Sequence, residues 1–222
     1  MAESLIAFIP AYNEAATIAA VVARTRPYVK EVVVVDDGSQ DQTAGVARAA
    51  GATVLVHPQN LGKGTAIATA LKYFLASDAA MAVFLDADGQ HAPEEIPKFA
   101  EAACSGAAAL VVGNRMGNTQ KMPLVRLCAN RLMSWLISCL AGQGIPDSQC
   151  GFRLLRRELV PALRLRGGRF DAETEMLIQA ARAGHKIVSV PIRTIYDPAR
   201  RSRIRPVRDT VRFLRLICTY WR

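Results

Sequence analysis

The chain has 222 residues, 51% of them hydrophobic, and a net charge of +9. This size and composition exclude a wholly disordered chain and suit one large domain. Its five cysteines form no Cys-x-x-Cys pair, which argues against a zinc site or a disulfide framework and fits reduced thiols in the cytosol.

The first half of the chain alternates apolar, strand-like runs with helical segments. Strands are predicted at 5–9, 32–35, 53–56, 81–85 and 110–112, and helices at 15–26, 43–50, 63–76 and 93–104. Asn13 is the expected N-cap of the first helix. Strands that alternate with helices in this way predict an α/β fold with a mostly parallel sheet flanked by helices.

The second half is less regular. It predicts helices at 124–141 and 173–183 and a strand at 187–190. The longest uncharged stretch, 132–146, is shorter than the ~20 apolar residues of a membrane span, so it is either a core helix or one lying in an interface. The N-terminus lacks a basic region followed by an apolar stretch, so we expect no signal peptide.

An oxygen-rich cluster follows the predicted strand 81–85. Asp86, Asp88 and Gln90 lie at the carboxyl end of this strand, the edge where open α/β sheets bind ligands. Such hard oxygen ligands suit Mg²⁺ or Mn²⁺ bound together with the phosphates of a substrate. For an isolated Asp-x-Asp sequence, a simple polar turn is the competing interpretation.

Polar clusters also follow the other early strands. Pro10 ends the first strand, Tyr12 offers a flat ring, and Glu14 can accept a hydrogen bond from a ribose or a base. Asp36 and Asp37 end the second strand, before residues typical of a turn and a helix start.

Lys63, at the start of the next predicted helix, lies between two glycines that allow close backbone approach, and it can meet an anion. The spacing of a P-loop is absent, which argues against a P-loop hydrolase.

Taken together, these clusters resemble glycosyltransferase family 2, whose members have the nucleotide-sugar-binding GT-A fold. Further motifs follow in order: Gly113-Asn114-Arg115, Pro123 to Arg126, Asp147 to Arg153, and Phe170 to Glu175. The series is similar to the branch of dolichyl-phosphate mannose synthases and polyprenyl-phosphate glycosyltransferases. The resemblance covers about residues 4 to 205.

The resemblance implies a role for each donor-side residue. Pro10, Tyr12, Glu14 and Asp37 would hold the base and ribose of the donor, and Lys63 and Asp86 would also belong to the donor site. Asp86, Asp88 and Gln90 would bind a divalent metal, Mn²⁺ or Mg²⁺, that bridges the donor diphosphate.

On the acceptor side, the resemblance implies that Arg115 and Arg126 face the donor and acceptor phosphates and act in catalysis together with Asp88. Asn130, one helical turn after Arg126, would assist them. Ser202 and Arg203 resemble a late Ser-Lys element near the acceptor, with arginine in place of lysine. The segment 196–200 departs from the glycine-containing loop that often precedes this element.

Other polar residues of these motifs have simpler interpretations. Asp147 is expected to orient Arg153, which is either a structural or a functional arginine. His91 either supports the metal ligands from behind or is an ordinary helix-start residue, and we favour the helix-start residue. Glu173 and Glu175 are expected to be structural or sugar-facing rather than metal ligands.

The chemical class of the acceptor can be inferred from the charged residues of the chain. An alcohol acceptor would need a carboxylate base, such as Asp147 or Glu173. A phosphate monoester is already largely dianionic at neutral pH, because its second pKa is about 6. What it needs is cationic positioning, which arginine provides through bidentate contacts. The abundance of arginine therefore favours a phosphate acceptor, with a soluble hydroxyl acceptor as the alternative.

The C-terminal segment is strongly basic. Residues 193–222 contain nine arginines and two aspartates, and Val211, Leu214, Ile217 and Trp221 recur on one predicted helical face. This segment either lies on an anionic membrane surface or packs on the domain. Nucleic-acid binding through this tail is the third alternative, but the tail has no recognisable nucleic-acid fold signature, so we expect no nucleic-acid partner.

We therefore predict a GT-A domain over residues 1–195, with a nucleotide-binding half at about 1–115 and an acceptor half at about 116–195. Residues 196–222 form a basic amphipathic segment. The predicted activity is inverting transfer of a sugar from a GDP-mannose or UDP-hexose type donor to a polyprenyl or dolichyl phosphate. We expect the protein to be peripheral at the cytoplasmic face of the cell membrane.

Overall fold

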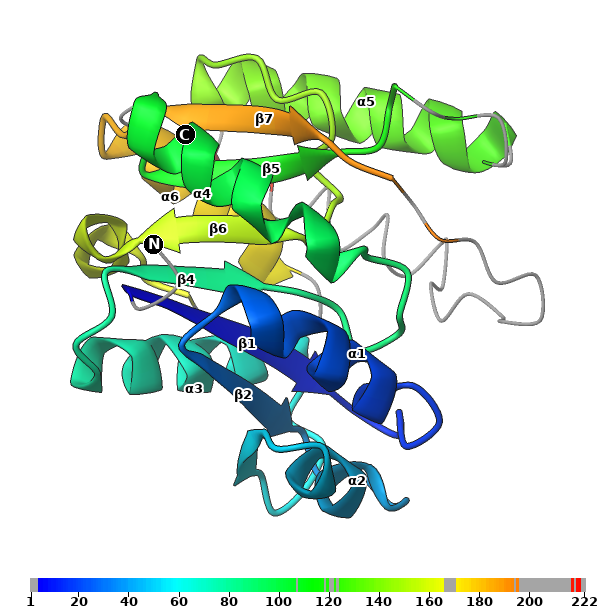
Figure 1. Ribbon diagram of the computed structural model, residues 1–222. Coiled ribbons are helices and arrows are strands. Elements are labelled where there is room, and N and C mark those ends of the chain that lie inside the picture. Colours follow the sequence, from blue (N-terminus) through cyan, green and yellow to red (C-terminus); the bar gives the residue numbers. More distant parts are fainter. Residues whose placement is uncertain are drawn as a thin grey trace.

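The computed structural model describes residues 4–106, 108–117, 119, 122, 124–165, 171–193, 195, 217, 219 and 220. Its centre is a seven-stranded sheet of order β3-β2-β1-β4-β6-β5-β7 (Figure 1). The strands are β1 (Leu5–Ala11), β2 (Glu31–Asp36), β3 (Thr53–Val56), β4 (Met81–Phe84), β5 (Leu110–Asn114), β6 (Arg153–Arg156) and β7 (Ile187–Pro191). Only β6 runs antiparallel to its neighbours. The prediction of a mostly parallel α/β sheet is confirmed.

In the part of the chain that the structure describes, six α-helices connect and cover the strands. They are α1 (Ile18–Thr25), α2 (Thr43–Ala49), α3 (Lys63–Ala76), α4 (Ile96–Ser105), α5 (Leu124–Ala141) and α6 (Asp171–Arg182). Short 3₁₀ segments are η2 (Arg26–Tyr28), η3 (Pro93–Glu95) and η4 (Arg157–Ala162). In Figure 1, α1 and α4 lie in front of the sheet and α3 and α6 behind it. Both faces of the sheet are thus covered, as expected for parallel strands rich in valine and isoleucine.

The hydrophobic core packs around the central strands and keeps their carboxyl ends together at one edge of the sheet. Val33 and Val34 on β2 are fully buried, and so is Phe8 on β1. Phe8 is the register partner of Phe84 on β4, and their rings stack at 5.5 Å between centroids. Because β1, β2 and β4 are parallel and in register, the loops that follow them emerge side by side.

Two local predictions are wrong, and one strand was not predicted. Pro10 does not end the first strand, because β1 continues to Ala11. Asn13 does not cap α1, which begins at Ile18 after Thr17. Asn13 instead adopts a positive φ of 53°, and its side-chain oxygen accepts a hydrogen bond from the backbone N–H of Gln40 at 2.8 Å. The strand that was not predicted is β6, which is only four residues long and begins and ends with arginine.

Tyr220, one of the few described residues near the C-terminus, packs on α6. Ile217 and Tyr220, from the predicted amphipathic segment, are buried. The Tyr220 hydroxyl accepts a hydrogen bond from the Gln179 side chain at 2.7 Å, and the Arg182 guanidinium lies 5.2 Å from the Tyr220 ring centroid. The predicted acceptor residues Ser202 and Arg203 lie outside the described residues.

Among the helices of the described residues, none is both long enough and apolar enough to cross a bilayer.

Candidate active site

A lysine and two carboxylates meet at the carboxyl edge of the sheet. Asp86 lies two residues beyond β4, Lys63 is the first residue of α3, and Glu173 is on α6. The Lys63 ammonium donates to the Asp86 carboxylate and to Glu173 Oε1, the latter at 2.9 Å. Burial lowers the pKa of Lys63, but the two carboxylates outweigh it and raise this pKa overall. Lys63 therefore stays protonated and fixes both carboxylates.

Two further residues, His91 and Gly151, lie next to Asp86. His91 is buried, its Nδ1 accepts the backbone N–H of Asp86 at 3.1 Å, and its Nε2 lies 3.7 Å from Asp86 Oδ2. The His91 ring stacks on Phe152 at 5.3 Å between centroids. The expectation of an ordinary helix-start residue is wrong, because His91 positions the Asp86 loop.

The two carboxylates of the Asp-x-Asp sequence have opposite pKa shifts. Burial raises the pKa of Asp86, but the charge of Lys63 and its hydrogen bond outweigh burial and lower the pKa overall. Burial also raises the pKa of Asp88, and the negative charge of Asp86 raises it further. Asp88 thus lies in a negative potential that a bound cation would relieve.

These oxygens fit a divalent cation shared with a substrate. Two carboxylates on one loop are the usual protein contribution to a Mg²⁺ or Mn²⁺ ion that also binds phosphates. Within the described residues, no three His, Cys, Asp or Glu side chains are grouped to hold a metal by themselves. The bonds described for Gln90 are made by its main chain, to Asp88 Oδ1 and from Ile195. Its role as third ligand stays a prediction.

Arg115 is held by a buried carboxylate. Its Nε and Nη2 donate to the two oxygens of Asp147 at 2.7 and 2.9 Å, and its backbone N–H donates to Asp147 Oδ2 at 3.1 Å. Asn130 donates to Asp147 Oδ1 at 3.1 Å and accepts from Ser134. The side chain of Asp147 is fully buried. This network fixes the guanidinium where its charge acts on Asp86.

The expectation that Asp147 orients Arg153 is wrong. Arg153 on β6 is buried and donates to three main-chain carbonyls, those of Ser148, Cys150 and Glu173. It therefore joins the 148–150 loop to the start of α6 and has a structural role. Asn130 uses both of its polar groups to hold Asp147 and Ser134, and its contact with an acceptor stays a prediction.

One of the four predicted nucleotide residues, Tyr12, lines a groove at the other end of the same edge. Tyr12, Gly38, Gln40 and Asn60 are among the residues that line this groove of about 490 Å³. Pro10 is the sixth residue of β1, and the buried Glu14 accepts from the Thr17 hydroxyl at 3.2 Å.

Asp37 lies beneath the groove rather than open to it. Its carboxylate accepts the backbone N–H groups of Leu61 and Gly62 at 3.0 and 2.7 Å and lies 2.8 Å from His57 Nδ1. Asp37 thus holds the loop that precedes α3, and its contact with a nucleotide stays a prediction.

Some site residues lay beyond the reach of sequence reasoning. His57, the partner of Asp37, carried no motif signal. Gly151 belongs to the motif Asp147 to Arg153, but only the structure shows why a glycine is needed there. A Cβ at this position would lie 2.6 Å from Asp86 Oδ2. Arg126 is on α5, and its side chain is outside the described residues.

The model of glycosyl transferase family 2 matches residues 6–164 of this chain. The chain belongs to this family. This glycosyltransferase is 34% identical over 220 residues to the UDP-N-acetylglucosamine–dolichyl-phosphate N-acetylglucosaminyltransferase of Methanococcus voltae, covering 88% of each chain. It is 31% identical to the undecaprenyl-phosphate mannosyltransferase of Micrococcus luteus, covering 85% of this chain and 82% of that protein.

Solved structures place the fold of this glycosyltransferase among GT-A enzymes. Glucosyl-3-phosphoglycerate synthase from Mycobacterium tuberculosis, in complex with Mn²⁺ and UDP-glucose, superposes with a TM-score of 0.72 at 26% identity. The match covers 96% of this chain and 76% of that chain. The expected GT-A fold and family are therefore confirmed.

Proposed function

We propose that this glycosyltransferase transfers a sugar, with inversion, from a nucleotide-sugar donor to a polyprenyl phosphate. The observation that carries the proposal is Arg115, a buried cation that Asp147 holds beside the Asp86 loop. A fixed guanidinium beside two carboxylates suits phosphate groups that approach a metal-bound diphosphate. Relatives named for dolichyl-phosphate and undecaprenyl-phosphate acceptors support this reading.

The donor half, at about 1–115, would bind the nucleotide. The groove beside Tyr12 would receive the base and ribose, and Glu14 and Pro10 would contribute to their binding. Asp86, Asp88 and Gln90 would hold Mn²⁺ or Mg²⁺, which supplies Lewis-acid stabilisation of the leaving diphosphate. Lys63 would exchange part of its contact with Asp86 for a donor phosphate. The donor class is a GDP-mannose or UDP-hexose type.

The acceptor half, at about 116–195, would position the attacking phosphate. Its arginines, Arg115 and Arg126, would orient the phosphate, and no base is required because a phosphate monoester is already anionic. The two carboxylates considered as bases for a hydroxyl acceptor are both paired with a cation. Burial raises the pKa of Asp147, but its bond to Arg115 outweighs burial and lowers this pKa, and Glu173 is bonded to Lys63. Ser202 and Arg203 would belong to the same half.

We further propose that the enzyme works as a peripheral protein at the cytoplasmic face of the cell membrane, where a polyprenyl phosphate presents its head group. A soluble hydroxyl acceptor is the second candidate. It is favoured by one observation, the structural likeness to a glucosyl-3-phosphoglycerate synthase, whose name specifies a soluble acceptor.

The test is an acceptor comparison with the full chain. The protein is incubated with Mn²⁺, one of UDP-glucose, UDP-N-acetylglucosamine or GDP-mannose, and a short polyprenyl phosphate, the matching polyprenol, or 3-phosphoglycerate. We expect lipid-linked sugar only when polyprenyl phosphate is the acceptor, and Asp88→Asn should lose this product. Asp78→Asn changes an exposed aspartate paired with Lys30 and should keep normal activity. Product with 3-phosphoglycerate alone would support the second candidate, and full activity of Asp88→Asn would refute both.

A further inference from the structure

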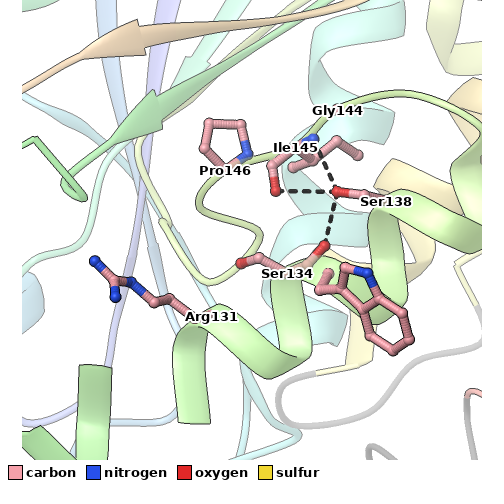
Figure 2. A pocket seen from close by; sticks show the side chains of 7 residues that line it. Arg131, Ser134, Ser138, Gly144, Ile145 and Pro146 are labelled. Carbon is pink, nitrogen blue, oxygen red and sulfur yellow. Dashed lines mark hydrogen bonds between the residues drawn. The ribbon is translucent and has the colours of Figure 1, made fainter. Parts of the chain in front are cut away.

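A largely buried histidine forms part of the groove proposed for the nucleotide. The segment 56–60 lines this groove, and the side chain of His57 within it is only 10% exposed. The hollow of about 380 Å³ along α5 is different, because among the described residues that line it the titratable one is the exposed Arg131. In that hollow the Ser138 hydroxyl bonds to the main chain of Ile145 (Figure 2). A buried titratable side chain thus lies in the wall of the nucleotide groove, and the proposed reaction has no direct use for it.

His57 joins three parts of the chain. Its backbone N–H donates to the Asp36 carbonyl at 2.9 Å, its Nδ1 lies 2.8 Å from Asp37 Oδ1, and its Nε2 lies 2.9 Å from Thr69 Oγ1 on α3. Because a carboxylate only accepts hydrogen bonds, Nδ1 carries a proton, and in the neutral ring Nε2 accepts from the Thr69 hydroxyl. Both ring nitrogens are therefore used within the protein, so His57 acts on the site through its neighbours.

The Asp37 carboxylate connects His57 to the start of α3. This carboxylate is buried, and besides His57 it bonds the backbone N–H groups of Leu61 and Gly62. Gly62 directly precedes Lys63, the first residue of α3. The second ring nitrogen of His57 holds the same helix less than two turns further on. His57 thus fixes the start of α3 at two points, and with it the position of Lys63.

The same histidine joins two segments that line the groove. Gly38 has a φ of +69°, and a Cβ at this position would lie 2.3 Å from the carbonyl carbon of Gln59. The turn after β2 and the segment after β3 are therefore in direct contact. The bond between His57 and Asp37 joins these two segments next to this contact. Loss of that bond would let the segment 57–60 move away from the turn.

We propose that His57 is a positioning residue of the donor site, which through Asp37 holds both the nucleotide groove and the start of α3 in place. A nucleoside diphosphate needs its base-binding groove and a phosphate-binding group such as Lys63 at a fixed separation, and one histidine supports both. The nature of this ligand rests on the proposed function, whereas the bonds of His57 do not. Loss of the bond to Asp37 should weaken donor binding without unfolding the protein.

Two substitutions separate the roles of the two ring nitrogens. His57→Asn keeps an N–H near the position of Nδ1, toward Asp37, whereas His57→Gln keeps one near the position of Nε2, toward Thr69. Binding of UDP and of GDP, each with Mn²⁺, is measured on the full chain by calorimetry, and the donor KM is measured by sugar transfer. His57→Gln should bind the nucleotide about tenfold more weakly and raise the donor KM by a similar factor, because a hydrogen bond to a buried carboxylate is lost. His57→Asn should stay within about threefold of wild type, and the acceptor KM should be unchanged in both.

The matched control is His185→Gln, which changes a histidine in the turn before β7 and should bind the nucleotide like wild type. The proposal is overturned if His57→Gln binds the nucleotide as tightly as wild type. It is also overturned if His57→Asn and His57→Gln lose equal affinity, which a purely structural role of the ring would produce.

Hydrogen exchange without any ligand supplies the second measurement. The backbone N–H groups of Leu61 and Gly62 donate to Asp37, so they should exchange about tenfold faster in His57→Gln and at the wild-type rate in His57→Asn. Unchanged exchange in His57→Gln would overturn the positioning role alone. A wild-type protein that binds neither UDP nor GDP would instead refute the proposed function and the donor role of His57 together. Failure of the acceptor assignment would change neither nucleotide binding nor exchange.

Discussion

Gly151→Ala should damage the active site while leaving the fold intact. The Cβ of alanine would lie 2.6 Å from Asp86 Oδ2 and 2.9 Å from Oδ1, closer than non-bonded atoms can approach. Asp86 cannot turn away at no cost, because Lys63 bonds its carboxylate and His91 holds its backbone N–H. The carboxylate must therefore move from the position in which it is proposed to meet the metal.

The size of the expected loss of activity follows from the overlap between the alanine Cβ and the Asp86 carboxylate. Relieving it needs a shift of about 1 Å, and displacements of that size at a reacting centre cost on the order of 100-fold in rate. The loss of stability should be smaller, about 1–3 kcal/mol, as for a single overpacked methyl group. Activity should thus fall much further than the amount of folded protein.

The assay is sugar transfer at several Mn²⁺ concentrations, with thermal unfolding measured on the same samples. Gly144→Ala is the matched control, because a Cβ there meets no atom within 4 Å and its backbone needs no special conformation. If Gly151→Ala folds like wild type and retains activity within about threefold, the placement of Asp86 against Gly151 is not what the metal site requires.

Three further predictions concern buried groups. Asp147→Asn should lower the free energy of unfolding in urea by about 3–5 kcal/mol, because it leaves Arg115 buried without its counter-charge. The control is Glu94→Gln, in an exposed pair with Arg24, which should lower this free energy by less than about 1 kcal/mol. Equal losses in the two variants would contradict the burial argument. Since the pKa of Asp147 is lowered in the folded state, its contribution is present above its unfolded pKa of about 3.9 and is lost as the pH falls below that value, so the stability gap between wild type and Asp147→Asn should narrow there and not above it. Burial raises the pKa of Cys150 to about 12, so native protein near pH 8 should be alkylated at Cys104 but not at Cys150, and rapid labelling of Cys150 would show that this region opens.

The fold was largely predictable because periodicity and composition agree along the first half. The β-branched run 32–35 and the strand 53–56 occur where the sequence places them, and the helix at 63–76 has the predicted bounds. Errors arose where tertiary contacts decide. Asn13 is a good capping residue by type, but its side chain is used across two loops. β6 is held by its neighbours β4 and β5, and no local signal marks it.

The candidate site was predictable in its residues but not in their pairing. Asp86, Lys63 and Arg115 were named from motifs, and the structure places them at one edge. Sequence order suggested that Asp147 serves Arg153, six residues away, whereas it pairs with Arg115, thirty-two residues away. Spacing cannot identify such partners, because they depend on how β5 and the loop after α5 approach each other.

The mixture of polar and apolar residues on the inward side of α5 explains why its sequence was ambiguous. A rather apolar helix with scattered serines predicts either a core helix or an interfacial one, and periodicity alone cannot separate the two. The structure assigns the polar residues Asn130 and Ser134 to the inside, where they hold Asp147 and the following loop. Ile137 of the same helix is fully buried in the hydrophobic core, so the inward side of α5 is both polar and apolar. One helix therefore contributes to the core and to the network that fixes Arg115, and its sequence alone does not show which of its residues serve which purpose.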